Sequence, residues 1–178
     1  MPTPDELHGR VEPSFHEDER AMLASYLDYH RATLVWKASG LTQAQLAQAL
    51  PSSSLTIGGL VKHMALVEDS WFTDRFAGLG EPEPWASVDW DADRDWEHHS
   101  AADDTPEELL ALYAGSCARS RAAYQAAESL DQRSAVPGGW TDEPFTLRWM
   151  VLHMIEETAR HNGHVDLLRE AIDGLTGE

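Results

Sequence analysis

Four long stretches of this sequence repeat apolar residues at the spacing of an α-helix, and this pattern constrains the fold more than any other feature. We expect helices over about residues 15–38, 56–77, 105–130 and 145–172. No stretch alternates apolar and polar residues as regularly as these helical patterns repeat, so no β-strand is predicted. The pattern therefore predicts an all-α fold, a four-helix bundle whose sites are built from side chains on facing helices.

Residues at the expected helix ends support these limits. Thr105 can cap the third helix, with Pro106 in its first turn and Glu108 closing a capping box. Gly40 follows the first helix, in the position where glycine commonly ends one. Thr42 can cap a short additional helix before the second long one.

The segment of residues 81–104, between the second and third helices, is the least regular part of the chain. Connections of this length are uncommon in compact domains and often functional. Aromatic side chains of this size bury much apolar surface, so we expect the segment to pack back onto the bundle. Its three tryptophans are Trp85, Trp90 and Trp96. His98 and His99 could gate a site, but we expect them to be an exposed polar pair.

The length of 178 residues fits a single domain spanning residues 1–178. No apolar run is long enough for a membrane span, and the start, residues 1–6, lacks the basic and apolar parts of a secretory signal. The lone Cys117 excludes an intrachain disulfide and fits a reducing compartment. We therefore expect a cytoplasmic protein in which Cys117 is a packed structural thiol.

The chain is strongly acidic, with 31 Asp and Glu against 13 Lys and Arg and a formal net charge of −18. Such a field repels phosphate groups, which argues against nucleic acid and anionic membranes as partners. The acidic residues are spread along the sequence, as on a solvated surface.

Four side chains that can bind metal or carry protons share one face of the expected fourth helix. His153, Glu157 and His161 are four residues apart, and His164 follows three residues later. Neighbouring members of this stripe are close enough to bind one ion. The spacing matches neither the His-Glu-x-x-His of zinc proteases nor the Glu-x-x-His of ferritin-like sites.

A facing helix offers a third ligand to complete a site with Glu157 and His161. His63 lies in a strongly apolar stretch of the second helix, so its imidazole is expected to point inward. Two nitrogens, one carboxylate oxygen and an open position make the arrangement of a catalytic zinc site, although nickel or iron would also fit. Glu157 and His161 could equally form a surface ion pair, and His63 a core histidine. Gly163 would mark a close approach of a helix or ligand, or a break in the helix.

Residues 147–170 and 60–76 together resemble the DinB-like superfamily of four-helix metalloproteins, in particular an uncharacterised branch typified by the mini-circle protein. This superfamily also contains mycothiol-dependent maleylpyruvate isomerase and bacillithiol S-transferases. The resemblance implies metal ligands at His63, Glu157 and His161, with glutamate at the second position as in the isomerase branch. It places His153 and His164 around the site, where they would orient ligands or move protons.

The resemblance implies a metal-dependent S-transferase, or a thiol-dependent isomerase, with zinc as the first expected metal. Its partners would be a small electrophile and a low-molecular-weight thiol such as mycothiol. Two alternatives stay open: a hydrolase using metal-activated water, and a non-enzymatic metal-binding stress or interaction protein. In the last case we expect bundle faces to pair into a homodimer.

Overall fold

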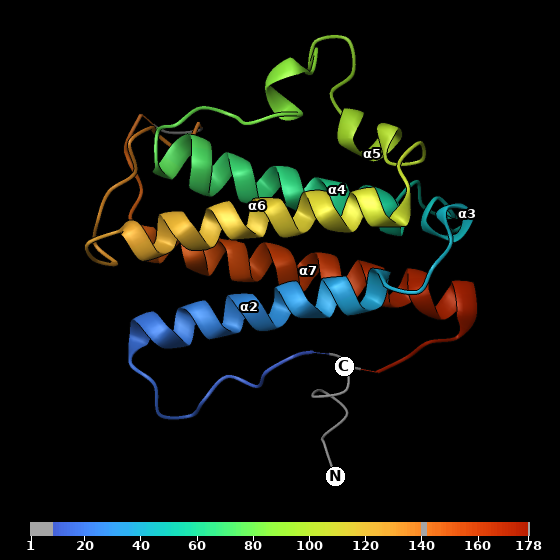
Figure 1. Cartoon of the computed structure of the whole chain (residues 1–178), viewed down its shortest axis with the longest axis horizontal. Coiled ribbons are helices and arrows are strands. Elements are labelled where there is room, and N and C mark those ends of the chain that lie inside the picture. The colour runs from blue at the N-terminus through green and yellow to red at the C-terminus, as the bar shows by residue number, and fades with distance from the viewer. Residues whose placement is uncertain (1–8, 140–141, 178) are drawn as a thin grey trace.

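The computed structural model describes residues 9–139 and 142–177, which form helices joined by loops (Figure 1). The acidic start of the chain, residues 1–6, lies outside this part. Within the described residues there is no strand, so the all-α prediction is confirmed. The helices are α2 (Glu19–Ala38), α3 (Gln43–Leu46), α4 (Ile57–Glu68), α5 (Trp96–Ser100), α6 (Pro106–Ala126) and α7 (Leu147–Asp173), with a π-helix η1 (Asp69–Phe76) and a 3₁₀-helix η2 (Trp85–Ser87).

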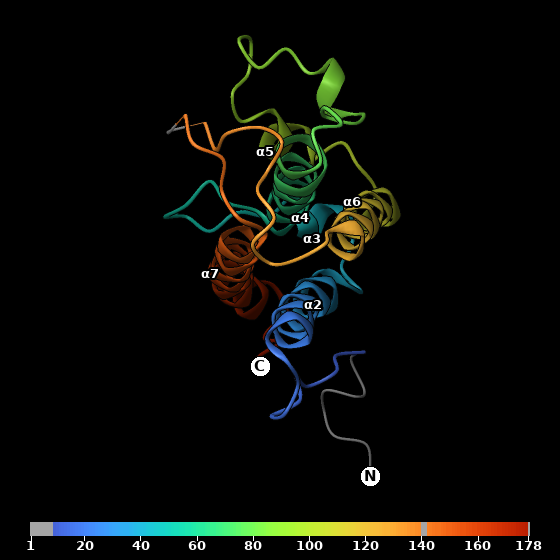
Figure 2. The ribbon, with the colours of Figure 1, turned by 90° about the vertical axis from the view of Figure 1, so that its left-hand side faces the viewer.

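The four long helices surround a common core, in the order α4, α6, α2 and α7 when seen end-on (Figure 2). The colour gradient in Figure 1 shows that α2 and α7 run in one direction and α4 and α6 in the other. Residues 77–105 must therefore return along the whole bundle before α6 begins, as a crossover connection. The segment between α2 and α4 turns back at one end instead.

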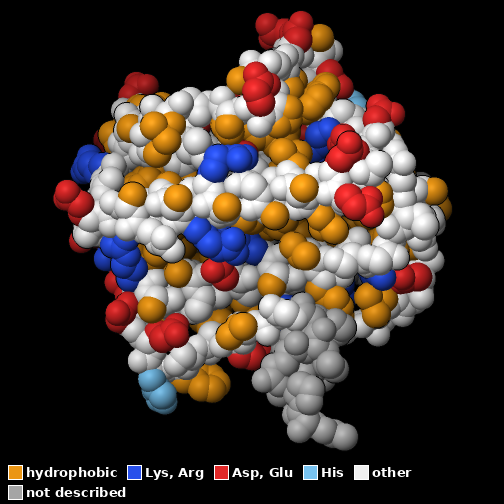
Figure 3. Space-filling view, viewed as in Figure 1, with side chains coloured by type: hydrophobic (Ala, Val, Ile, Leu, Met, Phe, Trp, Pro, Cys, Tyr) orange, Lys and Arg blue, Asp and Glu red, His pale blue; other side chains and the backbone are white. Residues whose placement is uncertain are grey.

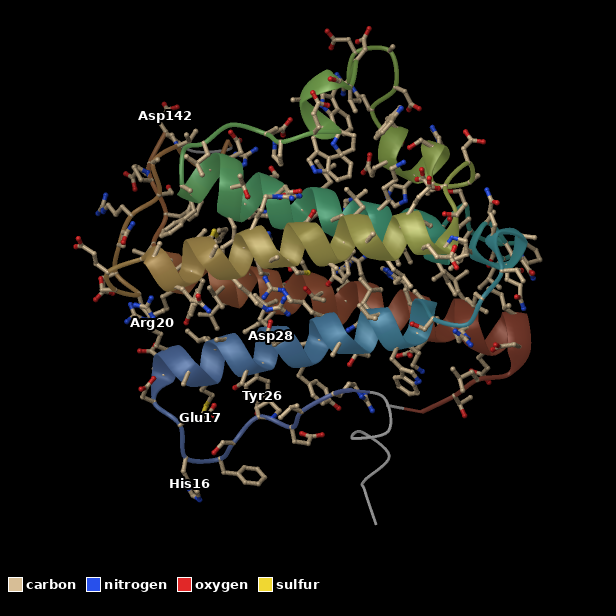
Figure 4. All side chains as sticks on the ribbon, viewed as in Figure 1. His16, Glu17, Arg20, Tyr26, Asp28 and Asp142 are labelled. Carbon is tan, nitrogen blue, oxygen red and sulfur yellow. The ribbon has the colours of Figure 1, made fainter. Side chains whose placement is uncertain are left out.

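The observed helix ends differ from the expected ones where side chains cap the backbone. α2 begins at Glu19 because Asp18 accepts a 2.9 Å hydrogen bond from the amide of Ala21. α6 ends at Ala126, where the guanidinium of Arg20 donates to the carbonyls of Tyr124 and Ala127, both at 2.7 Å. In Figure 4, Arg20 lies between α2 and this end of α6. These carbonyls are satisfied by a side chain from another helix, a contact that local sequence does not encode.

The centre of the bundle is apolar but contains charged side chains that are fully paired. Arg31 on α2 donates to both carboxylate oxygens of Glu68 on α4, at 2.7 and 2.5 Å. Asp69, at the start of η1, is fully buried and accepts hydrogen bonds from Ser116 and Arg119 on α6. The apolar core around these pairs includes Leu34, Leu60, Met64, Tyr113, Met150, Val151 and Met154.

Asp and Glu side chains are scattered over the face shown in Figure 3, including the projecting part of residues 77–105. This agrees with the expectation of a solvated acidic surface. No helix within residues 9–139 and 142–177 has the length and apolar character that a membrane crossing requires.

Candidate metal centre

Two predicted ligands from different helices are in direct contact. The ring of His63 on α4 meets the ring of His161 on α7 with centroids 5.0 Å apart and planes inclined by 67°. Both rings are half-buried, with side-chain exposures of 25% and 15%. Oε2 of Glu157, one helical turn before His161, lies 3.5 Å from His161 Nε2. His161 thus contacts both of the other predicted ligands.

The remaining members of the α7 stripe extend the cluster on both sides. His164 places its Nδ1 3.5 Å from Nδ1 of His161, and His153 places its Nε2 3.8 Å from Oε1 of Glu157. The ring of His153 also stacks on Trp149, with planes 12° apart, and meets the edge of Trp71. Each outer histidine therefore contacts one of the inner pair, Glu157 and His161.

The environment keeps the imidazole of His161 neutral. Burial disfavours its charged form most, and the neighbouring histidines, His63 first among them, add to the effect, so its pKa is lowered to about 4. A neutral imidazole with a free lone pair is the form of histidine that binds metal. The electrostatics of this position therefore suit a ligand at neutral pH.

The crossover segment brings two further side chains to His63. Glu97 on α5 is 5% exposed and its Oε1 lies 2.9 Å from Nδ1 of His63. His98 stacks on the other side of the same ring, with centroids 5.0 Å apart and planes 20° apart. Donor atoms of His63, Glu97 and His98 all lie within 4.8 Å of one another, so these three residues form a second possible metal-binding set that shares His63.

The expectation of an exposed His98–His99 pair is wrong for His98. His99 is exposed and pairs with Asp93, whereas the side chain of His98 is only 24% exposed and lies over α4. The reason is Gly59: a Cβ on this residue would lie 2.9 Å from Nδ1 of His98 and 3.4 Å from its Cα. The missing side chain lets α5 approach the backbone of α4.

Further contacts fix α5 and its segment against the bundle. Lys62, next to His63, places its ammonium 4.5 Å above the ring of Trp96 and donates to Asp104 at 2.5 Å. Trp85 is 1% exposed, and its indole nitrogen donates to Asp69 at 2.9 Å. The prediction that the tryptophan-rich segment packs back onto the body is confirmed, since Trp90 and Trp96 also pack against the core.

An open pocket of about 390 Å³ lies beside Glu97, between α4, η1 and the crossover segment. The indoles of Trp71 and Trp90 form part of its wall, and Glu81 and Arg94 add charged groups. Burial, reinforced by the negative charge of Asp74, raises the pKa of Glu81. The pocket thus offers aromatic and ionisable surface next to the histidine cluster.

Two other expectations concern Cys117 and Gly163. Cys117 is 3% exposed, and burial raises the pKa of its thiol to about 12, so the expected structural thiol is confirmed. Gly163 is exposed on α7, where a Cβ would meet nothing within 4 Å. It neither breaks the helix nor marks the close approach of another helix, so these two interpretations were wrong.

The sequence pattern did not identify Glu97. It stands in an irregular stretch, Asp95-Trp96-Glu97-His98-His99, without the periodicity that assigns a residue to a face. The available signals were the adjacent histidines and the Gly58-Gly59 pair, which is unfavourable in a helix unless another segment approaches closely. Only the fold connects these two signals.

Comparison with known proteins agrees with the fold. The family model described as mycothiol-S-transferase matches residues 22–174. A search of curated proteins gives no significant match. A crystal structure of a "conserved protein of locus from Enterococcus faecalis" is similar with a TM-score of 0.67 and 17% identity, covering 90% of this chain and 100% of that one. At this identity the structural match shows the fold alone.

Proposed function

The chain belongs to the mycothiol-S-transferase family, and we propose that it holds a divalent metal ion through His63, Glu157 and His161 and transfers a low-molecular-weight thiol to a small electrophile. The observation that carries this proposal is the contact of His63 with His161 across α4 and α7, beside Glu157. The resemblance of these three positions to the DinB-like ligand set supports the same assignment.

The residues present fit a metal. His63 and His161 offer two imidazole nitrogens and Glu157 one carboxylate oxygen, the donor set of many catalytic zinc sites, and zinc is the metal we propose. The lowered pKa of His161 keeps its nitrogen available at neutral pH. Nδ1 of His63 is engaged by Glu97, which leaves Nε2 as the nitrogen for a metal.

The competing set of His63, Glu97 and His98 is compact, but its central contact has the geometry of a hydrogen bond. A carboxylate 2.9 Å from an imidazole nitrogen is the usual arrangement of a group that orients a metal ligand from behind. We therefore assign the metal to the side of His63 that meets α7. Separate substitution of His98 and His161 distinguishes the two sets.

When bound, a divalent metal would lower the pKa of a coordinating thiol and so keep it as the nucleophilic thiolate at neutral pH. The chain's own Cys117 cannot supply that nucleophile, because its thiol is buried and its pKa is raised to about 12. The thiol therefore comes from a co-substrate. Trp71 and Trp149, both in contact with His153, supply an aromatic surface on which an apolar electrophile could lie.

The test is a thiol panel with a fluorogenic halide such as monochlorobimane. Protein purified without a histidine tag is assayed with mycothiol, bacillithiol or glutathione, before and after metal removal. We expect turnover with at least one thiol, lost on chelation and restored by Zn²⁺. His161→Gln should abolish the restored rate. His99→Gln, which changes an exposed histidine outside the proposed ligand set, should retain it.

Two results would contradict the proposal. A rate that survives complete metal removal would exclude a metal-dependent transferase. Metal-dependent turnover of ester or amide substrates without any thiol would indicate a hydrolase that uses the same residues.

A further inference from the structure

Glu97 is a buried carboxylate that lies outside the four long helices of the bundle. It lies on α5, within the crossover segment, and contacts His63 through Oε1 at 2.9 Å. Its other oxygen, Oε2, is buried and has no hydrogen-bond partner within the described residues. An ionised carboxylate in this setting needs a strong donor, and Nδ1–H of His63 is the donor in contact with it.

The geometry of the contact agrees with this reading. An ionised carboxylate can only accept a hydrogen bond. The 2.9 Å hydrogen bond between Oε1 of Glu97 and Nδ1 of His63 therefore places a proton on Nδ1, and an imidazole whose single proton is on Nδ1 has an unprotonated Nε2.

The ring of His63 is also restricted in orientation. His98 stacks against it from α5, and His161 meets it from α7. The docking of α5 that brings Glu97 and His98 here depends on the bare backbone of Gly59. Glu97 and His98 thus both reach His63 because α5 packs closely on α4.

We infer that Glu97 is a positioning residue for the metal centre: it holds His63 as the Nδ1–H tautomer and so presents Nε2 as the ligand nitrogen. This inference rests on the proposed function, since it takes His63 as a metal ligand. Carboxylates that orient ligating histidines in this way commonly govern metal affinity. The crossover segment therefore contributes to the site without supplying a ligand.

The test compares Glu97→Gln with Asp93→Asn. Asp93 contacts Nδ1 of His99 at 2.9 Å in the same segment but on the surface, so it is a matched carboxylate–histidine control. Co²⁺ affinity is measured by competition with a chromophoric chelator. The tautomer of His63 in metal-free protein is read from long-range ¹H–¹⁵N NMR correlations, assigned with His63→Gln.

We expect Glu97→Gln to weaken Co²⁺ binding about 10–100-fold and to remove the Nδ1–H preference of His63. Asp93→Asn should change neither. Should Glu97→Gln fail to fold, Glu97→Asp is expected to have the same two effects, because it retains the charge but shortens the reach to Nδ1. Circular dichroism melting identifies folded variants.

Unchanged affinity and tautomer in a folded Glu97 variant would overturn the inference. Loss of Co²⁺ binding in His98→Gln, with binding kept in His161→Gln, would also overturn it, because Glu97 would then be a direct ligand. Neither readout requires turnover. A protein that binds metal as described but transfers no thiol would therefore contradict the proposed function and leave the role of Glu97 intact.

Discussion

His63 on α4 and His161 on α7 lie ring against ring, with their centroids 5.0 Å apart. The contact joins two helices that are far apart in the sequence, and Glu157 and Glu97 flank it from α7 and α5. Such a concentration of imidazoles and carboxylates, half-buried beside an apolar core, is costly unless the groups have partners. A bound cation would serve as a common partner for them.

The first prediction concerns the acid sensitivity of the metal-free protein. Burial, reinforced by the neighbouring histidines, lowers the pKa of His161 in the folded protein to about 4, from the ordinary histidine value of 6.5. Between pH 6.5 and about 4, the unfolded chain takes up a proton on this histidine that the folded chain does not. The free energy of unfolding therefore falls as the pH decreases toward about 4. The shift corresponds to roughly 3 kcal/mol between these limits.

Urea unfolding of metal-free protein at neutral pH and near pH 4.5 measures this effect, with His161→Gln as the comparison. The variant should lose less stability on acidification than the wild type does. Equal losses in the two proteins would show that His161 does not carry the depressed pKa.

The second prediction concerns Asp69, which connects α6 to the crossover segment. Asp69 accepts hydrogen bonds from Trp85, Ser116 and Arg119. Removing one partner of a buried charged network is typically worth about 3–5 kcal/mol. We expect Asp69→Ala to lower the free energy of unfolding by an amount in this range and to release Trp85, which tryptophan fluorescence detects.

Glu19→Ala is the matched control for Asp69. Glu19 is an exposed carboxylate at the start of α2 that pairs at the surface with Arg148 at the start of α7. Exposed ion pairs contribute at most about 1 kcal/mol, so this change should have a small effect. If the two alanine variants were equally stable, the network around Asp69 would not stabilise the fold as argued.

The third prediction compares two helical glycines. Alanine is ordinarily better than glycine in a helix by up to about 1 kcal/mol, and Gly163→Ala should gain stability of this order because nothing lies near its Cβ. At Gly59 a Cβ would lie 2.9 Å from both His98 and Thr56. We therefore expect Gly59→Ala not to increase the stability of the protein and to displace α5 from α4.

Thermal unfolding of both variants measures the difference, and Co²⁺ affinity reports whether the displacement reaches His63. A Gly59→Ala protein as stable as Gly163→Ala, with unchanged affinity, would mean that α5 does not depend on close packing at this position.

The sequence predicts those parts of the fold that local periodicity encodes. The four helices and the cap at Thr105 are found where the apolar spacing and capping residues place them. The end of α6 was predicted too late, because Arg20 of another helix satisfies its last carbonyls. A contact of this kind depends on tertiary structure and leaves no local pattern.

The residues of the candidate site are likewise only partly predictable from the sequence. Glu157 and His161 share a helical face, which spacing alone can predict, and an apolar setting indicates that His63 points inward. Glu97 could not be predicted, because it reaches His63 through a long irregular connection whose path is set by Trp85, Lys62 and Gly59. The assignment of His63, Glu157 and His161 as metal ligands stays a prediction, as does the homodimer.

The most direct measurement is a Co²⁺ titration of untagged, metal-free protein, followed by its visible absorption spectrum. We expect one ion per chain in a low-coordinate site. His63→Gln, Glu157→Gln and His161→Gln should each lose more affinity than the roughly 10–100-fold expected for an orienting group, and His99→Gln none. Binding that survives substitution of His161 and Glu157 together, or no binding by the wild type, would contradict the assignment of the metal ligands.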